Sequence, residues 1–309
     1  MGFWIVAALV AVAGLALAVW MVKIEPRLYR VRRVRLPRVA NRTGEGVCVC
    51  ADRFPPLKIL HITDTHFEGD DGAKLEFLRR VALAGPYDFV FFTGDLIDCP
   101  RGLEGCFRMA EIVKGRLGSF AVLGGHDHYR AIFWKKRGLP GTGPPPPPQY
   151  RRPNPVSELI RGLKERGVEV LQDKSRVVSL GGGRRVAVVG LVDAFVYQPQ
   201  YEAAWKNVPD GLPTIVLAHS PDVLPEVARR RADLAFFGHT HGGQVRFPLV
   251  GAVVTRSRIE RSRASGVFRE SDTIFLINNG LGAGRGLSFR LLCRPEVTVA
   301  RLEDEELSA

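Results

Sequence analysis

The chain has 309 residues, of which 46% are hydrophobic and 25% are charged. This composition supplies enough apolar material for a sizeable core and excludes a disordered chain. The net charge of +12 suits either nucleic acid or a membrane surface as a partner, and the position of the charge along the chain decides between them.

The first predicted element is an apolar segment over residues 2–22, which contains no charged residue. A bilayer core about 30 Å thick needs roughly 20 apolar helical residues, so this segment can span a membrane. Trp4 and Trp20 lie near its two ends, where interfacial tryptophans are common. We therefore expect residues 1–22 to form a transmembrane anchor. The alternatives are a cleaved signal peptide, which usually has a basic leader and a shorter apolar core, and a buried core helix.

A basic stretch follows the apolar segment. Residues 23–42 contain eight basic residues and one acidic residue, so they carry +7 of the total +12. The positive-inside rule then places the rest of the chain in the cytoplasm, and the arginines can attract anionic lipid. We predict a basic juxtamembrane linker over 23–45 in a single-pass protein of the inner (cytoplasmic) membrane, with the bilayer rather than nucleic acid as partner. The five cysteines are scattered, which fits a reducing cytoplasm better than a disulfide framework.

From residue 46 to 309 we predict one catalytic domain, in which short apolar runs that end in polar residues alternate with helix-like stretches. The predicted strands are 57–67, 87–95, 119–128, 214–222 and 232–243, and the predicted helices are 73–85, 106–117 and 221–231. This alternation indicates an α/β fold with a buried, largely parallel sheet. Three later runs, 245–254, 272–280 and 296–302, predict a second sheet. The proline-rich residues 138–155 predict an exposed extended loop.

The candidate functional residues lie at the ends of the predicted strands. Each of the five predicted strands finishes in aspartate or histidine: Asp64 and His66; Asp95; His126 and Asp127; His219; His239 and His241. The carboxyl ends of such strands are where α/β proteins place their ligands. Unpaired buried carboxylates and imidazoles are costly, so a cation should compensate them, and carboxylate with neutral imidazole is a ligand set for divalent metals. The sequence therefore predicts a metal centre at these strand ends.

These motifs resemble the signature of the calcineurin-like metallophosphoesterases. That signature runs Asp-x-His, Gly-Asp, Gly-Asn-His-Asp, a later His and Gly-His-Thr-His, and this chain has DTH, GD, GGHD, AHSPD and GHTHGGQ in the same order. The resemblance covers about residues 56–302. The GHTHGGQ ending, the NNGLGAGRG run and the RPEVTVARL tail look most like the membrane-associated branch, which includes UDP-2,3-diacylglucosamine pyrophosphatases. The resemblance implies a four-layer α-β-β-α sandwich of two mixed sheets.

The resemblance also implies a role for each site residue. One of two divalent metals would be held by four residues: Asp64, His66, Asp95 and His241. The second would be held by three: the bridging Asp95, His219 and His239. His126 would stabilise the phosphoryl transition state or protonate the leaving oxygen, and Asp127 would orient the ring of His126. The ions would activate the attacking water and offset the charge on phosphorus. We expect manganese, with iron, zinc and cobalt as alternatives.

One position departs from the family pattern. The family has asparagine before the histidine of its Gly-Asn-His-Asp motif, where the amide oxygen usually binds the second metal, and this chain has Gly125. The second site is then one ligand short, and either water or His128 would fill the vacancy. A catalytically degenerate metal-binding module is the corresponding alternative to an active enzyme.

The predicted anchor limits the substrate. Residues 129–139 combine aromatic and basic side chains, which suits insertion into a lipid headgroup layer, so we expect Arg130, Phe133 and Trp134 to bind substrate; an ordinary amphipathic surface helix is the alternative. By analogy with the family, the substrate is a lipid-linked nucleotide pyrophosphate, UDP-2,3-diacylglucosamine, cleaved to UMP and a lipid phosphate in lipid A biosynthesis. A membrane-associated phosphodiesterase of different substrate is the alternative reaction.

Overall fold

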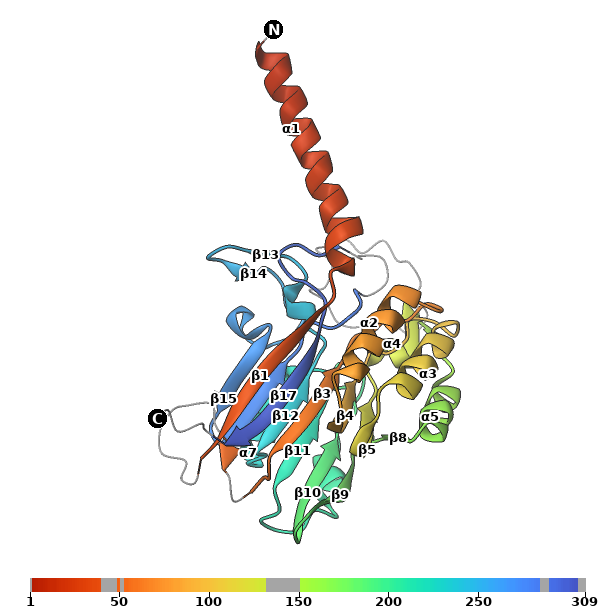
Figure 1. Cartoon of the computed structure of the whole chain (residues 1–309), viewed down its shortest axis with the longest axis vertical. Helices are drawn as coiled ribbons and strands as arrows, with labels where there is room; N and C mark the ends of the chain where they lie inside the picture. The colour runs from red at the N-terminus through yellow and green to blue at the C-terminus, as the bar shows by residue number, and fades with distance from the viewer. Residues whose placement is uncertain (1, 40–48, 51–52, 132–150, 284–288, 305–309) are drawn as a thin grey trace.

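The computed structural model describes residues 2–39, 49–50, 53–131, 151–283 and 289–304, and Figure 1 shows their arrangement. Two mixed β-sheets face each other, and helices lie against the outer surface of each sheet. A single apolar helix, α1, projects away from this body. The layers follow the order expected from the sequence, helix, sheet, sheet and helix.

The first sheet has seven strands in the order β2-β1-β17-β3-β4-β5-β8. From β3 to β8 the strands run parallel, whereas β17 is antiparallel to β3 and β1 is parallel to β17. The bounds in sheet order are Val49–Cys50, Arg30–Val39, Glu296–Asp304, Leu57–Ile62, Tyr87–Thr93, Gly115–Val122 and Val168–Val170.

The second sheet has six strands in the order β15-β16-β12-β11-β10-β9. Its four central strands are parallel, and an antiparallel strand closes each edge. The bounds in sheet order are Gly266–Glu270, Thr273–Ile277, Leu234–Phe237, Thr214–Leu217, Arg184–Gly190 and Lys174–Gly181. The central strands are short apolar runs, as expected for strands covered on both faces.

Three apolar clusters hold the layers together. The inner faces of the two sheets pack directly on each other, as in the edge-to-face contact of Phe91 with Phe236, whose ring centroids are 5.2 Å apart. A second cluster joins the first sheet to α2 (Gly72–Leu83), α3 (Gly102–Ile112) and α5 (Val156–Glu165). A third joins the second sheet to α6 (Tyr201–Trp205) and α7 (Leu224–Arg229). Burial on both faces of both sheets makes the body one four-layer unit.

The helix α1 (Gly2–Val19) continues through the π-helical turn η1 (Trp20–Ile24) and the 3₁₀ turn η2 (Glu25–Arg27). This continuous segment has 26 residues, and its most apolar stretch of 18 residues has a mean hydropathy of 2.7 and is not buried against the rest of the chain. A core helix would be covered by other elements, so this alternative is wrong. By length and composition the helix could serve as a membrane anchor.

The basic stretch after the apolar helix is not a linker along its whole length. Arg30–Val39 form β1, which pairs with β17 from Arg30↔Glu296 to Arg38↔Asp304. Val34 and Leu36 point into the core between the sheets, while the arginines that alternate with them are exposed. The buried carboxylate of Glu296 forms an ion pair with Arg30, in which Oε2 lies 2.6 Å from Nη2. The period-two alternation of arginine with apolar residues was the sign of a strand.

The C-terminal strands also differ from expectation. Residues 245–254 form a small separate hairpin, β13 (Arg246–Phe247) and β14 (Gly251–Ala252). β16 belongs to the second sheet as predicted, but β17 returns to the first sheet, between β1 and β3. The second sheet instead begins at Lys174 and includes the β11 and β12 strands, which sequence reasoning had placed in the first.

Candidate metal centre

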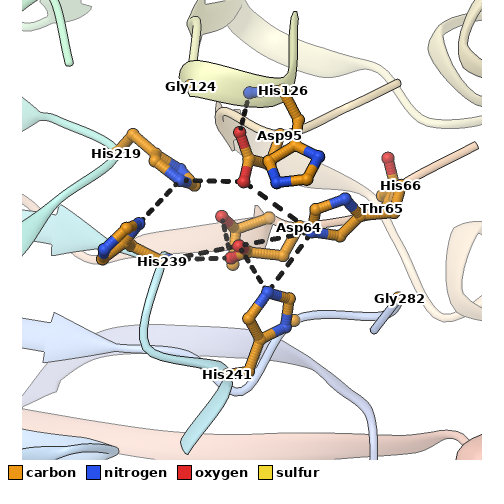
Figure 2. Close-up of polar contacts among 12 residues, drawn as sticks. Asp64, Thr65, His66, Asp95, Gly124, His126, His219, His239, His241 and Gly282 are labelled. Atoms are coloured by element: carbon orange, nitrogen blue, oxygen red, sulfur yellow. Dashed lines mark hydrogen bonds and ion pairs between the residues drawn. The ribbon is translucent and has the colours of Figure 1, made fainter. Parts of the chain in front are cut away.

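The predicted metal ligands converge at one edge of the two sheets (Figure 2). They follow β3 and β4 of the first sheet and β11 and β12 of the second, so each is delivered by the carboxyl end of a parallel strand. Five of them have left-handed backbone conformations, with φ between 45° and 68°: Asp64, His66, Asp95, His239 and His241. Such conformations are costly for residues other than glycine and cluster at functional sites.

The first half of the centre comprises Asp64, His66 and His241. The Nε2 atoms of the two imidazoles lie 3.3 Å apart, and Asp64 Oδ1 lies 3.4 Å from His241 Nε2 and 3.9 Å from His66 Nε2. All three residues are buried. Three donor atoms that face one another at these distances can hold one cation.

The second half comprises His219 and His239, and Asp95 lies between the two halves. His239 Nδ1 lies 3.3 Å from His219 Nε2. Asp95 Oδ2 lies 3.2 Å from His219 Nε2 and 3.7 Å from His66 Nε2. One carboxylate oxygen thus faces both halves, which is the arrangement needed for a ligand that bridges two cations.

In each of three imidazoles, the inner nitrogen faces the centre and the outer nitrogen faces away from it. The hydrogen bond made by the outer nitrogen decides whether the inner nitrogen is free to bind a metal. His219 Nδ1 contacts the Thr93 carbonyl at 2.7 Å, and His239 Nε2 contacts the Arg256 carbonyl at 3.0 Å. His66 Nδ1 contacts Asp98 Oδ1 at 2.7 Å. Because these partners are hydrogen-bond acceptors, the outer nitrogen of each ring carries a proton, and the neutral ring presents the lone pair of its inner nitrogen to the centre.

This donor set fits divalent metal ions. Two pairs of inner nitrogens face each other at 3.3 Å, and lone pairs at that distance repel unless a cation lies between them. Burial would lower the pKa of His219, but the charge and hydrogen bond of Asp95 raise it well above its usual value, so a metal ion must displace a proton from the inner nitrogen of His219. Burial would likewise raise the pKa of Asp95, but His219 and His126 lower it well below its usual value. The buried carboxylate is therefore ionised and attracts positive charge.

His126 lies at the rim of the centre rather than inside it. It belongs to the short helical turn α4 (Gly125–His128) after β5, its backbone N–H donates to Asp95 Oδ1 at 2.8 Å, and its side chain is 32% exposed. Burial lowers the pKa of His126, but the charge of Asp95 and the hydrogen bond with Asp98 raise it to about 9. A protonated, accessible imidazole beside the ligands can donate a proton to an incoming group.

The expectation that Asp127 orients the ring of His126 is wrong. The Asp127 carboxylate accepts hydrogen bonds from the backbone N–H groups of Leu96, Ile97 and Gly124, at 2.7, 3.0 and 2.9 Å. It therefore joins the loop after β4 to the turn that carries His126. The ring of His126 instead contacts Asp98, whose Oδ1 lies 2.6 Å from His126 Nδ1.

Asp98 is a site residue that sequence reasoning missed. One oxygen of its carboxylate contacts both His66 and His126. Burial would raise the pKa of Asp98, but the charge of His66 and the hydrogen bonds from both histidines lower it far below its usual value. The signal was a second carboxylate three residues after Asp95, in the stretch GDLID.

The surroundings of Gly125 include a second missed carboxylate. A Cβ at Gly125 would lie 3.5 Å from Asp193 Oδ2 and 3.1 Å from Val196 Cγ2. Asp193 follows β10, is buried, and its Oδ2 has no hydrogen-bond partner among the described residues. β10 therefore also ends in a carboxylate at the edge of the centre. His128, the residue suggested as a replacement ligand, has its Nδ1 3.3 Å from the Tyr197 hydroxyl.

The predicted substrate-binding residues are only partly described. Arg130 lies in β6 (Tyr129–Ala131), which pairs with β7 (Arg151–Pro153), and its side chain is half-buried. Phe133 and Trp134 lie outside the described residues, as does most of the proline-rich stretch. Their predicted role stays a prediction.

The sequences of known proteins that resemble this chain support a metal-dependent phosphoesterase site. The family model for calcineurin-like phosphoesterases matches residues 57–243. The chain is 28% identical over 258 residues to the metallophosphoesterase YkuE of Bacillus subtilis, covering 81% of this chain and 80% of YkuE. It is 26% identical over 322 residues to the UDP-2,3-diacylglucosamine pyrophosphatase LpxG of Chlamydia muridarum, covering 92% of each.

A third relative is the phosphodiesterase YaeI of Escherichia coli, which is 29% identical over 256 residues and covers 81% of this chain and 84% of YaeI. The matched family segment begins at β3 and ends just after His241, so it contains every metal ligand predicted from the sequence. The convergent strand ends, the two-sheet sandwich and the family match lead to one conclusion: the chain belongs to the calcineurin-like phosphoesterases and is a metal-dependent phosphoester hydrolase.

Proposed function

We propose that this enzyme acts at a bilayer surface on a lipid-linked nucleotide pyrophosphate, with UDP-2,3-diacylglucosamine cleaved to UMP and a lipid phosphate. The first half of the centre and Asp95 would hold one divalent cation, and the second half with Asp95 would hold the other. We expect manganese, and the ions would supply activation of water and neutralisation of phosphate charge. His126 would give a proton to the leaving oxygen.

The observation that carries this proposal is the common edge of the metal centre and α1. β1 begins at Arg30, three residues after the helical segment ends, so its amino end lies beside the anchor. β1 is parallel to β17, and β17 is antiparallel to β3, so the carboxyl ends of β3 to β5 lie at that same edge. The ligand-bearing loops therefore face the side of the domain from which α1 projects (Figure 1).

The anchor is also fastened to the loops that support the centre. Glu25 is 2% exposed, and its carboxylate accepts from Trp20 Nε1 at 2.9 Å and from the Cys293 backbone N–H at 2.6 Å. The Arg290 N–H donates to the Met21 carbonyl at 2.9 Å, and the Arg290 guanidinium donates to the Gly282 carbonyl. Gly282 N–H in turn donates to the carbonyl of Asp64. A short chain of contacts thus joins the helix to a metal ligand.

The membrane orientation is part of the proposal. The arginines of β1 follow the apolar helix directly, and the positive-inside rule favours the cytoplasmic side of the inner membrane for the catalytic domain. An anionic nucleotide headgroup presented by that leaflet would meet a centre rich in cations.

The deciding experiment is product analysis. The full chain in detergent micelles with manganese would be incubated with UDP-2,3-diacylglucosamine, and mass spectrometry would look for UMP and the lipid phosphate. Bis-p-nitrophenyl phosphate would be the soluble comparison substrate. Cleavage of the soluble ester without cleavage of the lipid nucleotide would favour the alternative of a membrane-associated phosphodiesterase, and the similarity to the phosphodiesterase YaeI supports the phosphodiesterase part of that alternative. Cleavage of neither would overturn both.

A further inference from the structure

The described part of the catalytic body exposes apolar side chains mainly in one place. Outside the helical segment that begins with α1, seven large hydrophobic side chains are exposed, and two of them, Leu83 and Tyr197, lie elsewhere. The other five lie on the β13–β14 hairpin or directly beside it: Phe247, Leu249, Val250, Val253 and Leu292. A cluster of exposed apolar side chains on the surface of a folded domain marks a binding surface.

The tip of the hairpin is the most exposed part of this surface. Leu249 is fully exposed and Val250 is 67% exposed. Leu249 and Gly251 both have positive φ, 65° and 73°, which closes the turn and holds the leucine outward. The chain therefore adopts a strained turn that presents Leu249 to the surroundings.

The hairpin lies next to the base of the anchor. The Arg246 N–H donates to the Leu291 carbonyl at 2.9 Å, and the adjacent Arg290 N–H donates to the Met21 carbonyl at 2.9 Å. Two hydrogen bonds and one peptide unit thus separate β13 from the end of the apolar helix, and Figure 1 shows both at the same end of the body. An anchor that enters a bilayer at Met21 places this hairpin at the membrane surface.

Basic residues border the apolar tip. Arg246 lies at its base, and the exposed Arg261 reaches the Val253 carbonyl with Nη1 at 3.5 Å. Apolar side chains flanked by arginine suit an interface where acyl chains lie beneath anionic headgroups. The hairpin is also close to the metal centre. His241 precedes Arg246 by only five residues, and a Cβ at Gly243 would lie 2.6 Å from Ala252 Cβ.

We propose that the β13–β14 hairpin inserts its apolar tip into the bilayer surface as a second membrane contact beside α1. The two contacts together hold the edge that carries the metal centre against the headgroup layer. The occupant of this surface is the lipid bilayer itself. This inference rests on the membrane anchoring in the proposed function and adds a contact that the anchor alone does not require.

The test uses fluorescence quenching in the full chain. Cys99, Cys106 and Cys293 are buried, so Cys48→Ser and Cys50→Ser give a background in which one new cysteine can be labelled with bimane. Leu249→Cys is compared with Leu83→Cys, because Leu83 is 87% exposed at the far end of α2. The proteins are reconstituted into vesicles of phosphatidylcholine and phosphatidylglycerol that contain brominated acyl chains, and flotation measures membrane attachment.

We expect the label at position 249 to lose most of its fluorescence in brominated vesicles and the label at position 83 to keep it. Flotation without quenching at position 249 would overturn the hairpin contact and leave the anchor intact. Failure of the full chain to float would overturn the membrane part of the proposed function, and the hairpin contact with it. The two failures are therefore distinguishable.

A kinetic comparison gives an independent readout. Leu249→Asp combined with Val250→Asp should lower kcat/KM for the lipid nucleotide on the order of tenfold, because apolar contact with the bilayer is lost. Hydrolysis of bis-p-nitrophenyl phosphate should not change, and Leu83→Asp should change neither activity. An equal loss on both substrates would contradict the proposal, since a lipid contact has no part in turning over a soluble ester.

Discussion

The two halves of the metal centre share Asp95 but differ in their remaining ligands. The first half adds a carboxylate, Asp64, to two imidazoles, and Asp98 orients one of those imidazoles. The second half adds two imidazoles oriented by backbone carbonyls, and Gly125 contributes no side chain to it. Carboxylates bring negative charge to a cation and imidazoles do not, so the first half should bind its metal more tightly.

The largest expected effect comes from the residue that the halves share. Asp95→Asn should lower turnover of bis-p-nitrophenyl phosphate on the order of 1,000-fold, because a neutral amide bridges two cations poorly. Elemental analysis should show loss of metal from both halves. Asp88→Asn is a matched control near the opposite end of the same strand, where Asp88 accepts from the Lys58 N–H, and it should keep both metals. Full metal content in Asp95→Asn would contradict the bridging role.

The halves can next be broken one at a time. His241→Ala and His239→Ala each remove one imidazole, and each should lower turnover roughly 100-fold, by analogy with measured losses at metal shells. Titration calorimetry with manganese should find one tight site remaining in His239→Ala and one weaker site remaining in His241→Ala. Equal residual affinities in the two variants would show that the halves are equivalent after all.

A smaller effect is expected at the carboxylate that orients the first half. Asp98→Asn should reduce activity by about 10- to 100-fold, because Asp98 positions the rings of both His66 and His126. The affinity of the first half for metal should fall as well, while the second half is unaffected. Asp70→Asn, at an exposed carboxylate paired with Arg108, serves as the control. Unchanged metal affinity in Asp98→Asn would limit its role to His126.

The smallest effect should come from restoring the side chain that the second half lacks. Gly125→Asn should tighten binding of the second metal by roughly tenfold, since it adds an oxygen ligand. Gly125→Ala is the matched control, because it brings the same Cβ to within 3.1 Å of Val196 Cγ2 but offers no ligand. Titration calorimetry would measure the affinity for the second metal. If this affinity were equal in the wild-type protein and both variants, the missing side chain at Gly125 would not explain any difference between the halves.

The sequence was informative about the centre because each ligand follows a strand directly. Asp64, Asp95, His219 and His239 are all recognisable from an apolar run that stops at a polar residue. The order of strands was harder to predict, since β17 inserts between β1 and β3 from the far end of the chain. A local hydrophobic period says which residues are buried but does not name the partner strand.

The difference between local patterns and contacts between distant segments also explains why the roles of some residues could not be predicted from the sequence. Asp127 is adjacent to His126 in sequence, yet its carboxylate turns toward backbone amides, while Asp98 reaches the ring from another loop. The charge of Arg30–Val39 predicts a linker, but these residues form a strand whose pairing with β17 is a contact across 266 residues. Contacts made through the folded chain decide these roles, and no local pattern specifies them.

The buried carboxylate of Glu25 has a consequence for how the enzyme meets its substrate. Glu25 and Arg290 fix the base of the helix to the body, so the membrane anchor proposed above would hold the domain directly rather than through a free tether. With the helix inserted as proposed, only lateral diffusion and rotation about the membrane normal would remain to the domain. For the lipid-linked substrate proposed above, encounter in the same leaflet would then be a two-dimensional search, in which the reactive edge approaches each substrate molecule at one constant height.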